Sequence, residues 1–102
     1  MRNTSCMINS KYSIGEALTY LQAQADTLSM LIGDEHEDRW KNVQHQANKM
    51  IEYASQTHLL LTIDISACYG YAEYLVGVWW VDDDGEVGTK QLVRGRSGFE
   101  MR

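Results

Sequence analysis

Residues 71–85 read YAEYLVGVWWVDDDG and predict a long β-strand, over residues 71–82, that runs into a tight hairpin turn. We expect the turn at Asp84-Gly85, because a two-residue type I′ turn needs positive φ at both positions and this pair is a preferred one. Residues 86–94 then return as the partner strand. Because side chains alternate across a strand, Trp79 and Trp80 must point to opposite faces of the sheet.

The first of two helices is predicted over residues 14–32. Ser13 and Glu16 match the capping box, in which the serine side chain accepts from a backbone N–H and the glutamate reaches back. Gly33 is placed to end the helix in a left-handed conformation. One apolar stripe follows at steps of three and four residues: Ile14, Ala17, Leu18, Leu21, Ala25, Leu28 and Ile32.

A second helix is predicted over residues 35–57. The carboxylates of residues 34–38 are favoured at a helix N-terminus, where the helix dipole is positive. The short connection makes the two helices antiparallel neighbours in a hairpin. The second apolar stripe consists of Trp40, Val43, Ala47, Met50, Ile51 and Ala54.

The hydrophobic period changes after His58, and the alternation that follows fits a strand, although the second helix could also extend through Leu61. The predicted fold class is α+β, an antiparallel helical hairpin packed on a small two- or three-stranded antiparallel sheet. The single domain is expected over residues 13–94, between a flexible N-terminal segment at 1–12 and a flexible C-terminal tail at 95–102. In the strand interpretation, Leu59, Leu61, Ile63 and Ile65 alternate with Leu60, Thr62, Asp64 and Ser66.

The composition is that of a small acidic globular protein. The 102 residues are 44% hydrophobic and carry a formal net charge of −5, which disfavours non-specific binding to nucleic acid or to an anionic membrane. No apolar run approaches the roughly 20 residues that span a bilayer, and the first residues lack the apolar centre of a signal peptide. We therefore expect a cytoplasmic protein with no membrane partner. Its two cysteines, Cys6 and Cys68, are expected to be free, with Cys68 buried.

No pattern predicts a metal, a cofactor or a catalytic centre. The histidines include no His-x3-His pair, and the chain has no Cys-x2-Cys pair of the kind that binds zinc. The acidic turn that begins at Asp82 lacks the glycine and glutamate positions of an EF-hand loop. Neither a glycine-rich phosphate loop nor a nucleophile elbow occurs, and nothing brings His58, Asp64 and Cys68 together. We predict that the protein is not an enzyme and has neither metal nor cofactor.

The predicted two-residue turn sets the pairing of the hairpin and sorts its side chains onto two faces. One face, assigned to the helices, holds Tyr74, Val76, Val78 and Trp80, with the pairs Trp80–Thr89, Val78–Gln91 and Val76–Val93. The opposite face, with Tyr71 and Glu73, has the pairs Trp79–Lys90, Gly77–Leu92 and Leu75–Arg94.

This second face has the composition of an interface centre, in which tryptophan, tyrosine and arginine carry most of the binding energy. The alternative is an ordinary exposed face, on which Lys90 and Arg94 lay their aliphatic stems over Trp79. The candidate partner-binding residues are Tyr71, Glu73, Leu75, Trp79, Lys90 and Arg94.

The function predicted from these features is that of a non-enzymatic, small acidic cytosolic protein that binds another protein as a regulator or stoichiometric inhibitor. Accessory proteins of phages and mobile elements are often chains of this type. The alternative, less favoured because acidic residues lie among the basic ones, is a nucleic-acid-binding regulator that uses the aromatic sheet face and the arginines Arg94, Arg96 and Arg102. A homodimer is compatible with both, since an open sheet face or edge can self-associate.

Overall fold

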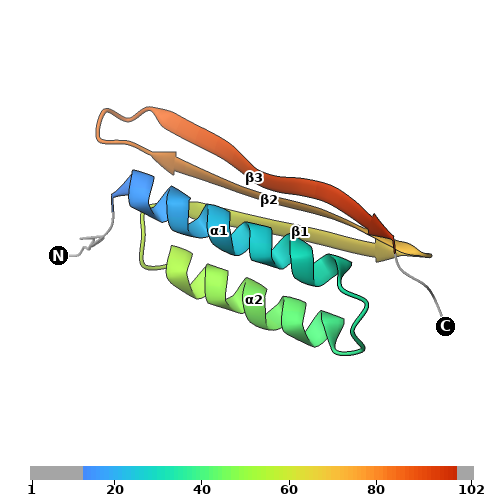
Figure 1. Cartoon of the computed structure of the whole chain (residues 1–102). Coiled ribbons are helices and arrows are strands. Elements are labelled where there is room, and N and C mark those ends of the chain that lie inside the picture. Colours follow the sequence, from blue (N-terminus) through green and yellow to red (C-terminus); the bar gives the residue numbers. More distant parts are fainter. Residues whose placement is uncertain (1–12, 99–102) are drawn as a thin grey trace.

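The computed structural model describes residues 13–98, which form two helices and a three-stranded antiparallel sheet (Figure 1). The strand order is β1-β2-β3, and both helices lie on one face of the sheet. The α+β prediction is confirmed, and the segment after His58 is a strand rather than an extension of the second helix. The predicted segment 1–12 and residues 99–102 of the predicted tail lie outside the described residues. The elements are α1 (Ile14–Gly33), α2 (Arg39–Ala54), β1 (Leu60–Cys68), β2 (Tyr71–Val81) and β3 (Val87–Gly98).

Helix α1 begins with the predicted capping box. The Ser13 hydroxyl accepts from the Glu16 N–H at 3.1 Å, and the Glu16 carboxylate accepts from the Ser13 N–H at 3.3 Å. The predicted left-handed Gly33 is wrong: Gly33 is the last helical residue, and the described glycines with positive φ are Gly70 and Gly85.

Helix α2 is shorter than predicted at both ends. It begins at Arg39 instead of residue 35, because local bonds in the preceding loop compete with the helix. In that loop the Asp34 carboxylate accepts from the His36 N–H at 3.2 Å, and the His36 ring accepts from the Asp38 N–H at 3.1 Å. The Thr57 hydroxyl, which accepts from the Leu59 N–H at 3.1 Å, lies in the turn that follows Ala54.

The buried side of α2 also differs from the predicted apolar stripe. Trp40 and Ile51 are 41% and 53% exposed, whereas Gln46 is buried. The Gln46 amide donates to the backbone carbonyl of Gln24 at 3.0 Å and to its side-chain oxygen at 2.9 Å, so a polar bond joins the two helices. A polar residue therefore occupies the side of α2 that faces α1.

The hairpin turn contains three residues between Asp82 and Glu86 instead of the predicted two. The Gly85 N–H donates to the Asp82 carbonyl at 3.0 Å and the Asp82 N–H donates to the Glu86 carbonyl at 2.9 Å. Gly85 has a positive φ of 80°, which is typical of a type I turn followed by a left-handed glycine. The Asp82 side chain accepts from the N–H groups of Asp84 and Glu86, both at 2.9 Å, and so stabilises the longer loop.

The longer loop shifts the pairing of β2 with β3 by one residue near the turn. A β-bulge between Val76 and Gly77 then takes up the shift by leaving Leu92 as an extra residue in β3. Beyond the bulge the predicted pairs Val76–Val93 and Leu75–Arg94 are confirmed. The other four predicted pairs are wrong; the observed pairs are Trp80–Gly88, Trp79–Thr89, Val78–Lys90 and Gly77–Gln91.

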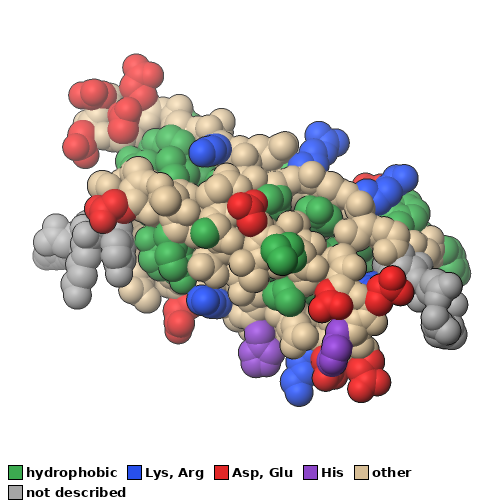
Figure 2. Space-filling model, in the orientation of Figure 1, with side chains coloured by type: hydrophobic (Ala, Val, Ile, Leu, Met, Phe, Trp, Pro, Cys, Tyr) green, Lys and Arg blue, Asp and Glu red, His purple; other side chains and the backbone are tan. Residues whose placement is uncertain are grey.

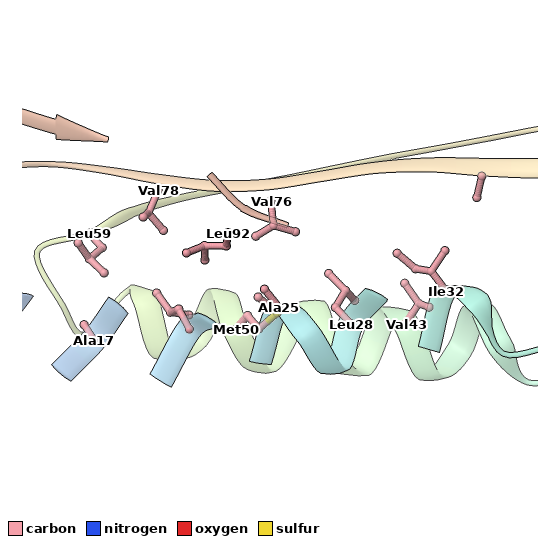
Figure 3. Close-up of a cluster of buried hydrophobic side chains, with 12 residues drawn as sticks. Ala17, Ala25, Leu28, Ile32, Val43, Met50, Leu59, Val76, Val78 and Leu92 are labelled. Carbon is pink, nitrogen blue, oxygen red and sulfur yellow. The ribbon is translucent and has the colours of Figure 1, made fainter. Parts of the chain in front are cut away.

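The hydrophobic core lies between the helices and the inner face of the sheet, meaning the face that the helices cover (Figure 3). Val76, Val78 and Leu92 project from the sheet towards α1 and α2. Two aromatic rings on the inner face lie over glycines of β3: a Cβ atom on Gly88 would come within 2.3 Å of the Trp80 ring, and one on Gly95 within 2.6 Å of the Tyr74 hydroxyl. Strand β3 continues to Gly98, so the predicted end of this strand at residue 94 is wrong.

Candidate functional site

The outer face of the sheet, opposite the helices, is not covered by any described element (Figure 1). Alternation places four predicted site residues of β2 on it: Tyr71, Glu73, Leu75 and Trp79. Arg94 joins them because it pairs directly with Leu75.

Two residues predicted on this face are not placed beside Trp79. The neighbour of Trp79 in β3 is Thr89, while Lys90 pairs with Val78, whose side chain belongs to the inner face. Leu92, the extra residue of the bulge, is only 6% exposed and belongs to the core. The error in both cases comes from the turn length, because a one-residue slip moves a side chain to the other face.

Strand β1 also contributes residues to the outer face, although the predicted face contained only residues of the β2–β3 hairpin. Its alternation is as expected, with Leu61, Ile63 and Ile65 facing the helices. Leu60 pairs with Trp79 and Asp64 pairs with Leu75. The alternation after His58 already indicates that Leu60 and Asp64 share one face of a strand. It does not indicate which residues of β2 they lie beside, because that depends on the pairing of β1 with β2.

The half of the outer face next to the hairpin turn is apolar. Trp79 is 41% exposed there, and its partner Leu60 is 53% exposed. Val81 and Val87 pair with each other and are also exposed. Four apolar side chains thus form a continuous patch, which we name the Trp79 patch: Leu60, Trp79, Val81 and Val87.

The other half of the outer face is charged. The Arg96 guanidinium donates to the Glu73 carboxylate at 2.7 Å, and its central carbon lies 4.3 Å from the centre of the Tyr71 ring. The hydrogen bond to Glu73 and the attraction of that carboxylate raise the pKa of Arg96. This pair lines an open depression of about 560 Å³, whose lining also includes Asp64, Ser66, Leu75 and Arg94.

Negative charge gathers at the two ends of the molecule. Figure 2 shows acidic side chains at the β2–β3 turn and again around the α1–α2 connection. The turn carries Asp82, Asp83, Asp84 and Glu86, which are all exposed. The Trp79 patch is therefore bordered by a cluster of carboxylates, and a partner that covers the patch comes close to four negative charges.

The residues considered for chemistry lie apart. His58 precedes β1 and Cys68 ends it, so the two are separated by roughly 30 Å of extended chain. Cys68 is exposed, which corrects the prediction that it is buried, whereas Cys6 lies outside the described residues. Within residues 13–98 no three histidine, cysteine or acidic side chains are grouped so that they could hold a metal ion. No helix in that range is long and apolar enough to cross a membrane.

Comparisons with protein-family models, with curated proteins and with solved structures give no match.

Proposed function

We propose that the protein is a non-enzymatic cytoplasmic interaction protein that binds another protein through the outer face of its sheet. The single observation that carries this proposal is the Trp79 patch, because a contiguous exposed apolar patch with a polar rim is the usual anatomy of an interaction site. A small domain without catalytic activity would act by occupying a site on its partner. It would then be a regulator or stoichiometric inhibitor, of the kind encoded by phages and mobile elements.

The partner surface that fits this face can be described by its chemistry. An apolar projection would cover Trp79 and Leu60, and basic side chains around it would meet the carboxylates of residues 82–86. At the far end of the face, Arg94 is available for an acidic group. Tyr71 and Glu73 act there by holding Arg96, so their part in binding is to shape the surface.

The nucleic-acid alternative is supported by one observation, the stacking of Arg96 on Tyr71 near Arg94. A single strand needs a continuous positive groove with aromatic platforms. Here Glu73 binds Arg96 and Asp64 lines the same depression, so the field in this region is mixed. Protein remains the better-supported partner.

The test is affinity capture from host-cell lysate with the unchanged chain and with Trp79→Ala, at moderate salt and after nuclease treatment. Met30→Ala is the matched control, since Met30 is exposed and apolar but lies on α1, in the other layer. A stoichiometric protein retained by the unchanged chain and by Met30→Ala, and lost with Trp79→Ala, is the expected result. A partner that disappears with nuclease would favour nucleic acid, and self-association lost with Trp79→Ala would favour a homodimer.

A further inference from the structure

We propose that the free edge of β1 and the adjoining side of α2 form a second binding site, which accepts an extended peptide segment of a partner protein as a fourth strand. This edge site does not depend on the function proposed for the outer face. It is defined by the outer edge of β1 together with Ile51 and Ala47 of α2.

The two edges of the sheet differ in how well they resist pairing with another chain. Strand β3 carries a bulge and three positively charged side chains, Lys90, Arg94 and Arg96, which are common protections of a sheet edge. Strand β1 pairs with β2 over nine residues without a bulge and contains neither glycine nor proline. Its one charged residue is Asp64. Within the described residues the other side of β1 is unpaired, so its outward N–H and C=O groups are available.

The helical layer is wider than the sheet beneath it. Helix α1 packs on β3 and β2, whereas α2 packs on β1 alone among the strands (Figure 1). Packed helices lie about 8–10 Å apart and neighbouring strands about 4.8 Å apart, so two helices cover about four strands. The sheet has three. Within residues 13–98, the part of α2 that extends past β1 thus has no strand below it.

The side chains of α2 on this overhang are apolar. Residues that contact α1, such as Gln46 and Tyr53, mark the inward side of the helix. Val43 and Met50 belong to the buried row of α2, and Gln46 and Tyr53 lie on the α1 side of that row. At 100° per residue, Ala47 and Ile51 lie on its other side, away from α1. Ile51 is 53% exposed, and Trp40, which lies over the Arg39 guanidinium, is on the same side. A strand added to β1 would place alternate side chains against this apolar surface.

The facing strand residues are incompletely covered for the same reason. Leu61, Ile63 and Ile65 point to the helices and pack against the core, but all three are only partly buried. An added strand would cover them from the open side. Apolar residues at every second position of the peptide would then contact both the isoleucines and Ile51.

The charge of the site defines the other face of the peptide. Asp64 is exposed on the outer face, and no ion pair joins its carboxylate to another described side chain. Directly opposed like charges destabilise a strand pair and opposite charges stabilise it. The expected peptide therefore alternates apolar residues with polar ones and has a lysine or arginine opposite Asp64.

A second copy of this chain fits the edge less well than a single strand. Antiparallel pairing of β1 with β1 of a second copy would bring the two α2 helices to the same face of one sheet. Their axes would be separated by about one strand spacing, roughly 5 Å, which is well below the 8–10 Å at which helices pack. A peptide segment without its own covering helix avoids this collision.

The experiment selects peptides of about ten residues, the length of a strand, from a random phage-displayed library on the full chain. Selected peptides are synthesised, and their affinity is measured by fluorescence polarisation against variants that circular dichroism shows to be folded. Ile51→Glu is expected to weaken binding at least tenfold, and Asp64→Lys to reverse the preference between a peptide and its lysine-to-glutamate version. Met30→Glu, an acidic substitution at an exposed apolar site on α1, and Trp79→Ala are expected to change affinity less than twofold.

Three results would overturn the proposal. The first is a library that enriches no alternating peptide. The second is peptides that bind Ile51→Glu normally and lose affinity with Trp79→Ala, which would place them on the outer face. The third is a chain that dimerises by itself in analytical ultracentrifugation and becomes monomeric with Ile51→Glu, which would show that a second copy covers the edge.

Discussion

The contact between Gly88 and Trp80 predicts that Gly88→Ala destabilises the domain strongly for so small a change. An added Cβ would lie 2.3, 2.4 and 2.6 Å from three atoms of the Trp80 indole, which is rigid and cannot fold aside as a long aliphatic chain can. The ring must therefore leave its position over β3, or the two strands must separate. Overpacking of this kind costs about 1–3 kcal/mol. A loss of about 2 kcal/mol lowers the Tm of a domain of this size by about 8–16 °C.

The assay is urea and thermal unfolding followed by far-UV circular dichroism. Gly77→Ala is the matched control, because its Cβ would lie 3.5 Å from the nearest atom, the Lys90 carbonyl oxygen, which is an ordinary contact. Gly77 has no positive φ, so this control should stay within about 1 kcal/mol of the unchanged chain, in either direction. A Trp80→Leu background removes the indole, and Gly88→Ala should cost much less there. An unchanged midpoint for Gly88→Ala, or an equal loss with and without the indole, would refute the reasoning.

Three further pairs of substitutions test other parts of the fold. Met50→Ala empties a fully buried site and should cost about 2–5 kcal/mol in urea unfolding. Trp79→Ala should remain folded with a nearly unchanged midpoint. Equal losses of stability in the two variants would mean that Trp79 belongs to the core. Ser13→Ala removes one acceptor of the capping box and should cost about 1 kcal/mol by thermal unfolding, a loss that Ser13→Asp should not show. Asp82→Ala leaves two turn N–H groups without their acceptor and should cost about 1 kcal/mol. Asp82→Asn keeps an acceptor oxygen and should cost less. A loss of equal size in both variants would contradict the turn geometry.

The helical hairpin could be predicted because its signals are local. The capping box of Ser13 and Glu16 and the stripe of α1 depend on neighbours three and four residues away. The turn of the hairpin could not be decided in the same way. A two-residue turn at Asp84-Gly85 and a three-residue loop that ends at Gly85 use the same residues. The backbone bonds between Asp82 and Gly85 and between Asp82 and Glu86 establish the second, and the Asp82 side chain stabilises it.

The wrong turn length affects the predicted outer face only between the turn and the bulge. Because the predicted pairing is shifted by one residue there, Lys90 and Leu92 were assigned to the wrong face. The bulge restored the pairing from Val76 onwards, so Arg94 was placed correctly beside Leu75. A bulge has no signal in this sequence, because Leu92 fits equally well as a regular strand residue.

The exposed side of α2 links the sequence pattern to the proposed edge site. The periodicity of α2 includes Ile51 among its apolar positions, yet the structure leaves that side chain more than half exposed. A stripe as wide as this one is expected where a helix is covered on two sides. Helix α1 covers one side through Gln46 and Tyr53, and the described strands end at β1 on the other. The apolar surface of α2 is therefore wider than the described part of the chain covers, and a fourth strand is the element whose width and hydrogen-bonding groups match the space beside β1.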